Sequence, residues 1–357
     1  MLAAIDAARV SVRLEMYIYT ASPVADRFRD ALVRAARRGA RVRVLLDAVG
    51  SFVLPESYWD DFKEAGGEFR WFNPISFGRF LYRNHRKILV CDDEHAFVGG
   101  LNIAPEYEGD GVTSGWRDLG MAAKGSLARE LADAVDASFR RAAGPHHRLQ
   151  RLRKSTARVT ASAESWRLLL SGPGRGHNFL KRTLADDLAT ARDVRLVSAY
   201  FLPTWRLRRE LESVTRRGGR VQLVLAGKSD VGLSLRASHR LYTGLMKRGI
   251  EIHEYQPQIL HAKLFVIDDH AYVGSANLDA RSLNINYELL VRVSEPAVVK
   301  EARDLFGEIL GQSRRVDLPA WRQSRSLWTK WLESWSYFVL ARLDPYLARL
   351  SLGRRKS

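Results

Sequence analysis

The stretch NHRKILVCDDEHAFVGGLN at residues 84–102 has a near repeat, ILHAKLFVIDDHAYVGSANLD, at residues 259–279. Both copies contain the pattern His-x-Lys-x-x-x-x-Asp, and both continue into a glycine-rich turn that ends in Asn. One such pattern arises by chance in a chain of 357 residues with odds of roughly a few per cent. Two copies with the same trailing Gly-x-x-Asn are not accidental. The duplication predicts two similar halves that each supply half of one site.

Other blocks repeat in the same order. VSVRLEMYIYT (10–20) matches DVRLVSAYFLPT (193–204), RRGARVRVLLD (37–47) matches RRGGRVQLVLA (216–226), and GGEFRWFNP (66–74) resembles RGIEIHEYQP (248–257). In each half, apolar runs alternate with helical patterns, which predicts an α/β fold. Strands are expected near 10–18, 41–46, 67–72, 85–91, 95–98, 193–200, 220–226, 250–255, 261–267, 271–273 and 286–293. Helices are expected near 24–38, 56–65, 126–143, 178–191, 204–217, 234–248 and 296–310.

These patterns divide the chain into two α/β domains, 1–145 and 163–313, each a mixed sheet flanked by helices. A Gly-Pro breaker at residues 144–145 marks the boundary, and the segment that follows is rich in basic residues, which predicts a linker at 146–162. The repeat stops near residue 313, so residues 314–357 are expected to form a separate tail.

The composition is strongly basic, with 57 Lys and Arg against 40 Asp and Glu and a net charge of +17. Such a charge favours anionic partners, meaning nucleic acid or acidic lipid headgroups, although solubility alone is an alternative reason for it. The single cysteine, Cys91, excludes a disulfide within the chain and is expected in the core. No apolar stretch reaches the roughly 18 residues of a membrane-spanning helix, and the first residues do not read as a secretory signal. A peripheral or cytosolic protein is therefore expected.

The spacing within each motif indicates which side chains act together. Residues i and i+2 of a strand face the same side, so His85 projects with Lys87, and His261 with Lys263. Asp92 lies seven residues beyond His85 and is not aimed with it, so it is expected to brace the strand end or the turn. The asparagines that follow the two hairpins, Asn102 and Asn277, can offer amide donors beside the histidines.

Two histidines, two lysines and two asparagines suit a phosphodiester. Lysines and amides stabilise charge on the non-bridging oxygens, one imidazole attacks phosphorus to form a phosphohistidine, and the other acts as acid and then base. Lysine is a poor metal ligand, and no His, Asp or Glu cluster has metal-ligand spacing. We therefore expect neither a metal ion nor another cofactor.

A working imidazole usually needs a carboxylate that fixes its tautomer. Glu288 is the candidate in the second half and Asp118 in the first, while Glu15, in an otherwise apolar strand, is expected at an interior position of the site. Each of the three is equally well read as an ordinary charge. Ser275, in the second glycine-rich turn, is added to the phosphate-binding or orienting set.

The paired motifs resemble those of the phospholipase D superfamily. Within it, the chain is most similar to bacterial cardiolipin synthases of the B type, on the segments RLEMYIYT, VGGLNIAPEY, GWRDL, SAYFLPT and VGSANLDARSLNINYE. The resemblance implies two α/β domains in a pseudo-twofold arrangement and ping-pong transfer of a phosphatidyl group, with His85 as the expected nucleophile. It implies the catalytic set His85, Lys87, Asp92, His261, Lys263 and Asp268.

Two features depart from the family pattern. Motif one has Gly100 where Ser is usual, and five residues separate Asp268 from Gly274 where six separate Asp92 from Gly99. The shorter second hairpin puts the register of Asp268, Gly274 and Ser275 in question.

The tail carries a row of aromatic residues at helical spacing, with basic neighbours and a basic end at Arg354, Arg355 and Lys356. The row consists of Trp321, Trp328, Trp331, Trp335 and Phe338. This pattern is typical of an amphipathic helix at a membrane surface, and the alternative is a helix packed on the protein's own core. The insertion ISFGRFLYRN (75–84) is interpreted either as a lipid-facing gate or as a buried loop.

The leading hypothesis is a phosphatidyltransferase that makes cardiolipin while bound peripherally to the cytoplasmic side of the cell membrane. Phosphatidylglycerol is the expected acceptor, and the donor is a second phosphatidylglycerol or another phospholipid such as phosphatidylethanolamine. The alternatives are hydrolysis by the same intermediate, as a phospholipase D or a metal-independent nuclease, and a lipid-binding scaffold with a decayed site. Nucleic acid is an expected partner only for the nuclease.

Overall fold

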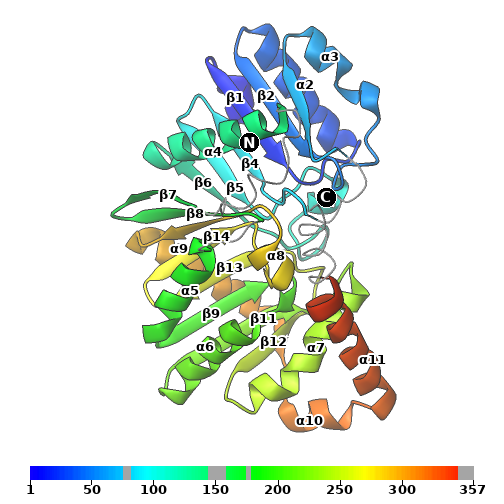
Figure 1. Ribbon diagram of the computed structural model, residues 1–357, viewed down its shortest axis with the longest axis vertical. Helices are drawn as coiled ribbons and strands as arrows, with labels where there is room; N and C mark the ends of the chain where they lie inside the picture. Colours follow the sequence, from blue (N-terminus) through cyan, green and yellow to red (C-terminus); the bar gives the residue numbers. More distant parts are fainter. Residues whose placement is uncertain (75–81, 144–157, 174–177, 345–357) are drawn as a thin grey trace, which may run out of the picture.

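The computed structural model describes residues 1–74, 82–143, 158–173 and 178–344. Two mixed sheets lie one above the other in Figure 1, the first half of the chain above the second, and helices flank both sheets. The helices are α1 (Leu2–Ala7), α2 (Pro23–Arg37), α3 (Asp60–Glu64), α4 (Ser126–Ala143), α5 (Phe179–Thr190), α6 (Trp205–Arg216), α7 (Gly232–Met246), α8 (Ala280–Asn284), α9 (Pro296–Gly311), α10 (Leu318–Gln323) and α11 (Leu327–Phe338).

The first sheet has the order β3-β2-β1-β4-β5-β6. Its strands are β1 (Ser11–Met16), β2 (Arg41–Asp47), β3 (Glu68–Phe72), β4 (Ile88–Cys91), β5 (His95–Gly99) and β6 (Gly120–Lys124). β1, β2 and β3 run parallel, whereas β4, β5 and β6 pair antiparallel. Every residue of β1 is buried, which suits a central strand covered on both faces.

The second sheet has the order β17-β12-β11-β9-β13-β14-β16-β8-β7. Its strands are β7 (Arg158–Ala163), β8 (Trp166–Ser171), β9 (Asp193–Ser198), β11 (Arg220–Ala226), β12 (Glu251–Tyr255), β13 (Lys263–Ile267), β14 (His270–Gly274), β16 (Glu288–Val293) and β17 (Ser313–Arg315). The run β12-β11-β9-β13-β14-β16 repeats the order of the first sheet. The predicted α/β fold with two similar halves is therefore confirmed.

The two halves share a hydrophobic core. One buried cluster joins residues of β4 and β5 to residues of β8 and β16, with the inner face of α4 packed among them. Leu89 and Leu14 instead belong to a cluster inside the first half, and Leu196 and Phe265 to one inside the second. Because apolar area is buried between the halves as well as within them, their relative position is set by packing.

Several strands lie where none was expected. β6 has the sequence GMAAK, whose small residues have low strand propensity. β7 and β8 flank a turn at residues 164–165, and β7 begins at Arg158, inside the segment expected to be a linker; residues 144–157 lie outside the described part. The short pair β10 (Phe201–Leu202) and β15 (Leu278–Asp279) was also missed.

The aromatic row of the tail lies on two helices rather than one within the described residues 314–344. α10 ends at Gln323, and the Ser326 side chain caps α11 by accepting from the Thr329 N–H. The chain therefore turns between Trp321 and Trp328. Trp321 is only 8% exposed and packs on Tyr242, with ring centroids 4.9 Å apart, so the prediction that it lies on the exposed aromatic face is wrong.

The other members of the predicted aromatic face are exposed on α11. Trp328 is 65% exposed and Trp331 54%, and Trp335 and Phe338 are similarly open. None of the described helices is long and apolar enough to cross a membrane. Arg354, Arg355, Lys356 and most of the 75–84 insertion lie outside the described residues.

Candidate active site

The two His-x-Lys segments are held by backbone bonds from the opposite half. The His85 N–H donates to the carbonyl of Tyr287, at 2.9 Å, just before β16. The His261 N–H donates to the carbonyl of Arg117, at 2.8 Å, shortly before β6. The histidines precede their strands, which begin at Ile88 and Lys263, so the strands expected from 85 and 261 start later. Each histidine therefore lies at the contact between the halves.

Carboxylates reach the imidazoles in a crossed manner. Oε2 of Glu288, in the second half, lies 3.0 Å from Nδ1 of His85 in the first half. Oδ2 of Asp118, in the first half, lies 2.6 Å from Nδ1 of His261 in the second half. Both carboxylates are fully buried. When Nδ1–H donates to a carboxylate, the lone pair of Nε2 is left for a substrate.

The strand registers make Asp118 and Glu288 equivalent residues. Gly99 of β5 pairs with Gly120, and Gly274 of β14 pairs with Leu290. Each carboxylate thus stands two residues before the partner of the first motif glycine. A Cβ on Gly99 would come within 2.4 Å of the Leu119 carbonyl oxygen, and one on Gly274 within 2.2 Å of the Leu289 oxygen. Both motifs need glycine here because the neighbouring strand approaches closely.

The residue that directly follows this glycine differs between the two motifs for a steric reason. Ser275 donates its hydroxyl to Oε2 of Glu288 at 2.5 Å and accepts from the Leu289 N–H. At the equivalent Gly100, a Cβ would come within 2.2 Å of Oδ1 of Asp118. The Asp118 carboxylate thus fills the space that a serine side chain would need. The local packing therefore explains why Gly100 stands where the family pattern has Ser.

The two lysines curl back toward the histidines of their own motifs. Nζ of Lys87 donates to the carbonyl of His85 at 2.8 Å. Nζ of Lys263 contacts the carbonyl of His261 and lies 2.9 Å from its Nδ1. Both lysine side chains are buried. Two ammonium groups are therefore held beside the imidazoles in a space that excludes most water.

Burial dominates the electrostatics of this cluster. Desolvation lowers the pKa of His85 and the pKa of His261 to about 4, against the opposing attraction of Glu288 and Asp118. Desolvation also lowers the pKa of Lys87 to about 7 and the pKa of Lys263 to about 8. Lys263 contributes to the lowered pKa of both His85 and Lys87, which shows that the groups of the two halves interact. With these pKa values, both imidazoles are neutral at pH 7.

Aromatic rings that the sequence did not single out surround the histidines. Tyr17 meets His85 edge-on at 4.7 Å between ring centroids, and Lys87 Nζ lies over the Tyr17 ring at 4.9 Å. Tyr107 and Trp116 approach His261 at 5.4 and 5.6 Å. These rings form apolar walls that limit the positions of the imidazoles. Their only sequence signal is that each lies a few residues from a predicted site residue: Tyr17 follows Glu15, Tyr107 follows Asn102, and Trp116 precedes Asp118.

The asparagines flank the cluster in different ways. Asn102 accepts from the Ile18 N–H and donates Nδ2 to the Tyr107 hydroxyl at 2.6 Å, and that hydroxyl lies 3.5 Å from Nδ1 of His261. Asn277 is buried, and its Oδ1 has no partner among the described residues. Asn102 thus acts on the cluster through Tyr107.

The motif aspartates lie at the far ends of their hairpins. The Asp92 carboxylate accepts from the N–H groups of Arg9, Val10 and Ser11 at 2.8 to 2.9 Å. Asp268 accepts in the same way from Arg192 and Asp193. The structure does not bring either aspartate to the His–Lys cluster. They tie each hairpin turn to the beginning of the neighbouring strand.

The one-residue difference between the hairpins is confined to these turns. Cys91 pairs with His95 around a three-residue turn, whereas Ile267 pairs with His270 around a two-residue turn. Asp92, Asp93 and Asp268 adopt positive φ there. At the end of each hairpin nearer the site, Ile88 pairs with Val98 and Leu264 pairs with Val273. These two pairs occupy equivalent motif positions, so the strand register is the same in both motifs.

Glu15 supports the first motif from β1 without touching an imidazole. It is fully buried, and its Oε1 accepts from Nδ2 of Asn84 at 2.6 Å. The Asn84 N–H donates to Oδ2 of Asp47 at 2.7 Å. Burial raises the pKa of Glu15 and raises the pKa of Asp47 to about 6. Asp47, which the sequence did not reveal, and Glu15 together fix the residue that precedes His85.

Buried Arg86 also ties the halves together. Its guanidinium donates to the carbonyls of Glu288 and Ser171 at 3.2 and 3.1 Å. In the part of the chain that the structure describes, no three His, Cys, Asp or Glu side chains come together as a metal site would need. The site is thus a cluster of two imidazoles, two ammonium groups and two carboxylates.

Comparison with known proteins shows the family of the chain. The family described as cardiolipin synthase, PLD-like domain, matches residues 1–139 and 184–310. Cardiolipin synthase 1 of Bacillus anthracis is 31% identical over 95% of this chain and 69% of its own length. Cardiolipin synthase B of Salmonella typhimurium is 31% identical over 88% of this chain and 78% of its own length.

Among solved structures, the phosphatidylserine synthase of Haemophilus influenzae superposes with a TM-score of 0.74 at 13% identity, covering 97% of this chain and 91% of that one. This likeness shows the shared fold. The family match covers both halves, including both motif segments and both crossed carboxylates. The chain therefore belongs to the cardiolipin synthase family of phospholipase D-like proteins, which are phosphatidyltransferases.

Proposed function

We propose that this phosphatidyltransferase makes cardiolipin at a membrane surface by two-step transfer through a phosphatidyl-histidine. The observation that carries the proposal is the pair of buried imidazoles, each with Nδ1 bound by a carboxylate of the opposite half and each beside a lysine. The pairs supply a nucleophile, a proton carrier and positive charge at one place.

In the first step, Nε2 of His85 attacks the phosphorus of a donor phospholipid. The bond from phosphorus to the headgroup oxygen breaks, and His261 gives its proton to that oxygen. His85 is assigned as the nucleophile because its side chain is 12% exposed against 6% for His261. An anionic phosphodiester raises the pKa of His261, which lets it carry the proton in the occupied site.

In the second step, the hydroxyl of phosphatidylglycerol loses its proton to His261 and attacks the same phosphorus. The bond from phosphorus to His85 breaks, which restores both imidazoles. Lys87 and Lys263 stabilise the charge on the non-bridging oxygens in both steps. Glu288 and Asp118 fix the tautomers of His85 and His261. The side chains of this catalytic cluster are positioned by Asn102, Asn277 and Ser275. Asp92, Asp268 and Glu15 support the segments that carry the histidines.

The donor is phosphatidylglycerol or another phospholipid such as phosphatidylethanolamine, and the enzyme acts peripherally on the cytoplasmic side of the cell membrane. The net charge of +17 and the exposed aromatic residues of α11 support the membrane part of the proposal.

The test incubates the protein with phosphatidylglycerol vesicles, with and without phosphatidylethanolamine, and follows the lipids by mass spectrometry. We expect cardiolipin with the wild type and with His95→Gln, which alters a histidine in the same hairpin, and none with His85→Ala. Acid quenching followed by peptide mass spectrometry should locate the phosphatidyl group on His85. Phosphatidic acid in place of cardiolipin would show hydrolysis, and an adduct on His261 would reverse the assigned roles.

A further inference from the structure

A large groove lies beside the second sheet, and none of its lining residues belongs to the His–Lys cluster. It has a volume of about 1430 Å³ and runs between α5, α6, α8 and the end of α11. This volume exceeds the roughly 300–1,000 Å³ of a typical small-molecule site. The groove is therefore wide enough for part of a large amphipathic molecule.

The lining of the groove is strongly cationic. Glu210 is the one acidic residue among the described residues that line it. Its basic residues are Lys181, Arg182, Arg206, Arg208, Arg209, Arg216 and Arg342. Apolar side chains such as Leu202, Leu283 and Leu343 lie between them. Guanidinium groups mixed with apolar surface match a ligand that carries both phosphate and hydrocarbon.

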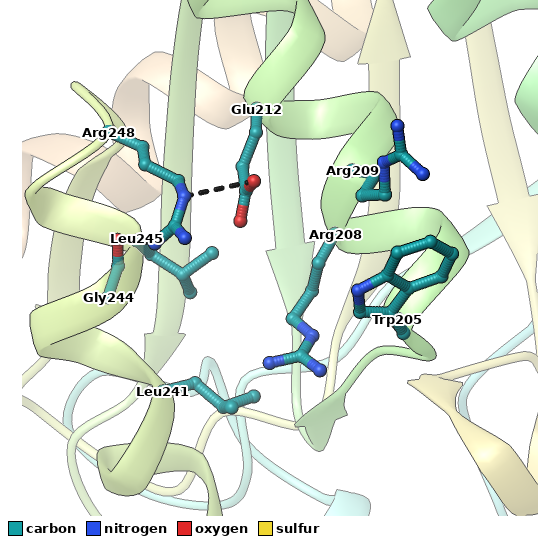
Figure 2. Close-up of a pocket in the computed structure, with 8 residues that line it drawn as sticks. All are labelled: Trp205, Arg208, Arg209, Glu212, Leu241, Gly244, Leu245 and Arg248. Atoms are coloured by element: carbon teal, nitrogen blue, oxygen red, sulfur yellow. Dashed lines mark hydrogen bonds and ion pairs between the residues drawn. The ribbon is translucent and has the colours of Figure 1, made fainter.

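Arg208 lies where this groove meets a smaller pocket, and none of the carboxylates that the structure describes forms an ion pair with it. Figure 2 shows its guanidinium extending between α6 and α7, near Leu241 and Trp205. The nearby carboxylate of Glu212 is engaged by Arg248 at 3.0 Å. The buried Nε of Arg208 has no hydrogen-bond partner among the residues that the structure describes. An unpaired donor in such a place is costly unless a ligand accepts from it.

The smaller pocket has the dimensions of an anionic headgroup. Its volume is about 130 Å³, which is space for about four waters at roughly 30 Å³ each, or for the four oxygens of a phosphate. Arg209, over the Trp205 ring at 4.6 Å, adds a second guanidinium to its lining.

Exposed aromatic residues border the same groove. Trp205, at the start of α6, is 59% exposed, and Phe338, at the end of α11, both lines the groove and belongs to the exposed aromatic face of α11. Trp is favoured where one side of a ring meets hydrocarbon and the other meets water. These rings favour a bilayer as the partner and not a nucleic acid, which would present phosphates without hydrocarbon.

The groove is also connected to the chain segment that follows Asn277 of motif two. α8 begins at Ala280, three residues after Asn277, and its Arg281 bonds Asp344 at 3.0 Å. The end of the α11 region is thereby fixed to the segment that leaves motif two. A lipid bound in the groove would belong to the bilayer that supplies the substrate.

We propose that this groove is an accessory site for an anionic phospholipid, whose phosphate binds Arg208 and whose acyl chains lie along Trp205 and Phe338. The proposal rests on the proposed membrane-surface function and extends it to a second, non-catalytic lipid site. The site keeps the enzyme on anionic membrane while the His–Lys cluster exchanges substrates.

The experiment compares Arg208→Gln and Arg208→Glu with Arg129→Gln, which removes an exposed charge on α4 in the other half. Sedimentation measures binding of the full chain to phosphatidylcholine vesicles with and without phosphatidylglycerol. Arg208→Gln removes the attraction of one basic residue to an anionic surface and should weaken vesicle binding about fivefold. Arg208→Glu replaces that attraction with repulsion and should weaken vesicle binding about 25-fold. Arg129→Gln should bind like the wild type, and no variant should differ on pure phosphatidylcholine.

A second measurement separates this site from catalysis. Cardiolipin formation from dissolved short-chain phosphatidylglycerol should be the same for Arg208→Gln and the wild type. The proposal would be overturned if Arg208→Gln weakened vesicle binding no more than Arg129→Gln does, or did not weaken it at all. It would also be overturned if Arg208→Gln lost activity on the dissolved lipid, or if the same loss of binding appeared with duplex DNA in place of vesicles. Vesicle binding that depends on Arg208 in a protein that makes no cardiolipin would refute the proposed function alone.

Discussion

Oε2 of Glu288 lies 3.0 Å from Nδ1 of His85, across 203 positions of sequence. The reciprocal pair, Asp118 and His261, is joined at 2.6 Å. Each of the two motif histidines thus takes its carboxylate from the opposite half. The reactive tautomers are therefore defined only when the halves are packed together, and a site of this kind links catalysis to the contact between the halves.

The crossed pairing predicts a large effect of Glu288→Gln. The amide keeps the size of the side chain but no longer fixes the His85 tautomer or stabilises an imidazolium, so kcat should fall roughly 10²–10⁴-fold. Asp118→Asn should act similarly through His261. Steady-state kinetics with dissolved short-chain phosphatidylglycerol measures both.

The matched control is Glu295→Gln, at the exposed residue that precedes α9. It should retain wild-type kcat. A Glu288→Gln protein that is folded and within a few-fold of wild-type activity would show that the carboxylate has no part in the reaction.

The repeated motifs made the two-half fold and the His–Lys pairs predictable, because strand and helix periodicity survive in both copies. The crossing of Glu288 and Asp118 was not predictable, since it depends on how the halves dock. Trp321 was misplaced because a three-residue break, capped by Ser326, interrupts a pattern that reads as one helix. Asp47 gave no signal because its role is to accept the backbone N–H of Asn84.

The buried lysines predict an alkaline limit to activity. Lys87, with a pKa of about 7, and Lys263, with a pKa of about 8, lose their charge as the pH rises, and His85 is protonated only near its pKa of about 4. Loss of the two lysine charges should therefore make kcat/KM decline as the pH rises through about 7 to 8.

Glu288 raises the pKa of both lysines. Its replacement by Gln should consequently move the alkaline decline to lower pH, as residual kcat/KM measured against pH would show. A profile that stays level from neutral pH to well above pH 8 would contradict the proposed role of lysine charge.

The same pKa shift affects stability with a defined sign. The folded-state pKa of Lys87, about 7, lies below its ordinary value of 10.5. Between these pH values the unfolded chain binds a proton that the folded chain has lost. The contribution of Lys87 to the free energy of unfolding therefore increases as the pH rises. Lys87→Met should remove that slope, and denaturant unfolding at pH 7 and pH 9 measures the difference from wild type.

Gly100 should not tolerate the serine found at the equivalent Ser275. The new Cβ would come within 2.2 Å of Oδ1 of Asp118, so the carboxylate must move away from His261. Gly100→Ser should lower kcat at least tenfold, with a smaller effect on vesicle binding. The double variant Gly100→Ser with Asp118→Ala removes the clash, and it should be no less active than Asp118→Ala alone.

The motif aspartates are expected to act on stability more than on chemistry. Asp92→Ala leaves three backbone N–H groups without their charged acceptor, and hydrogen bonds to charged groups contribute about 1.5–3 kcal/mol each. Because these amides lie near the surface and water replaces part of the loss, the free energy of unfolding should fall by about 2–4 kcal/mol. The rate per folded molecule should stay within a few-fold of wild type.

The neighbouring Asp93→Ala is the control, because Asp93 is about half-exposed and its ion pair is with Arg13, which Asp136 also binds. It should cost less than Asp92→Ala in urea unfolding. The folded-state pKa of Asp92 is lowered by these backbone hydrogen bonds, outweighing the opposing effect of burial, so its stabilising effect is present above the ordinary carboxyl pKa and is lost as the pH falls below it. The difference in stability between wild type and Asp92→Ala should therefore shrink toward acid pH. If Asp92→Ala unfolds like wild type but loses its activity, then the aspartate acts in the reaction itself, and the hairpin contact is incidental.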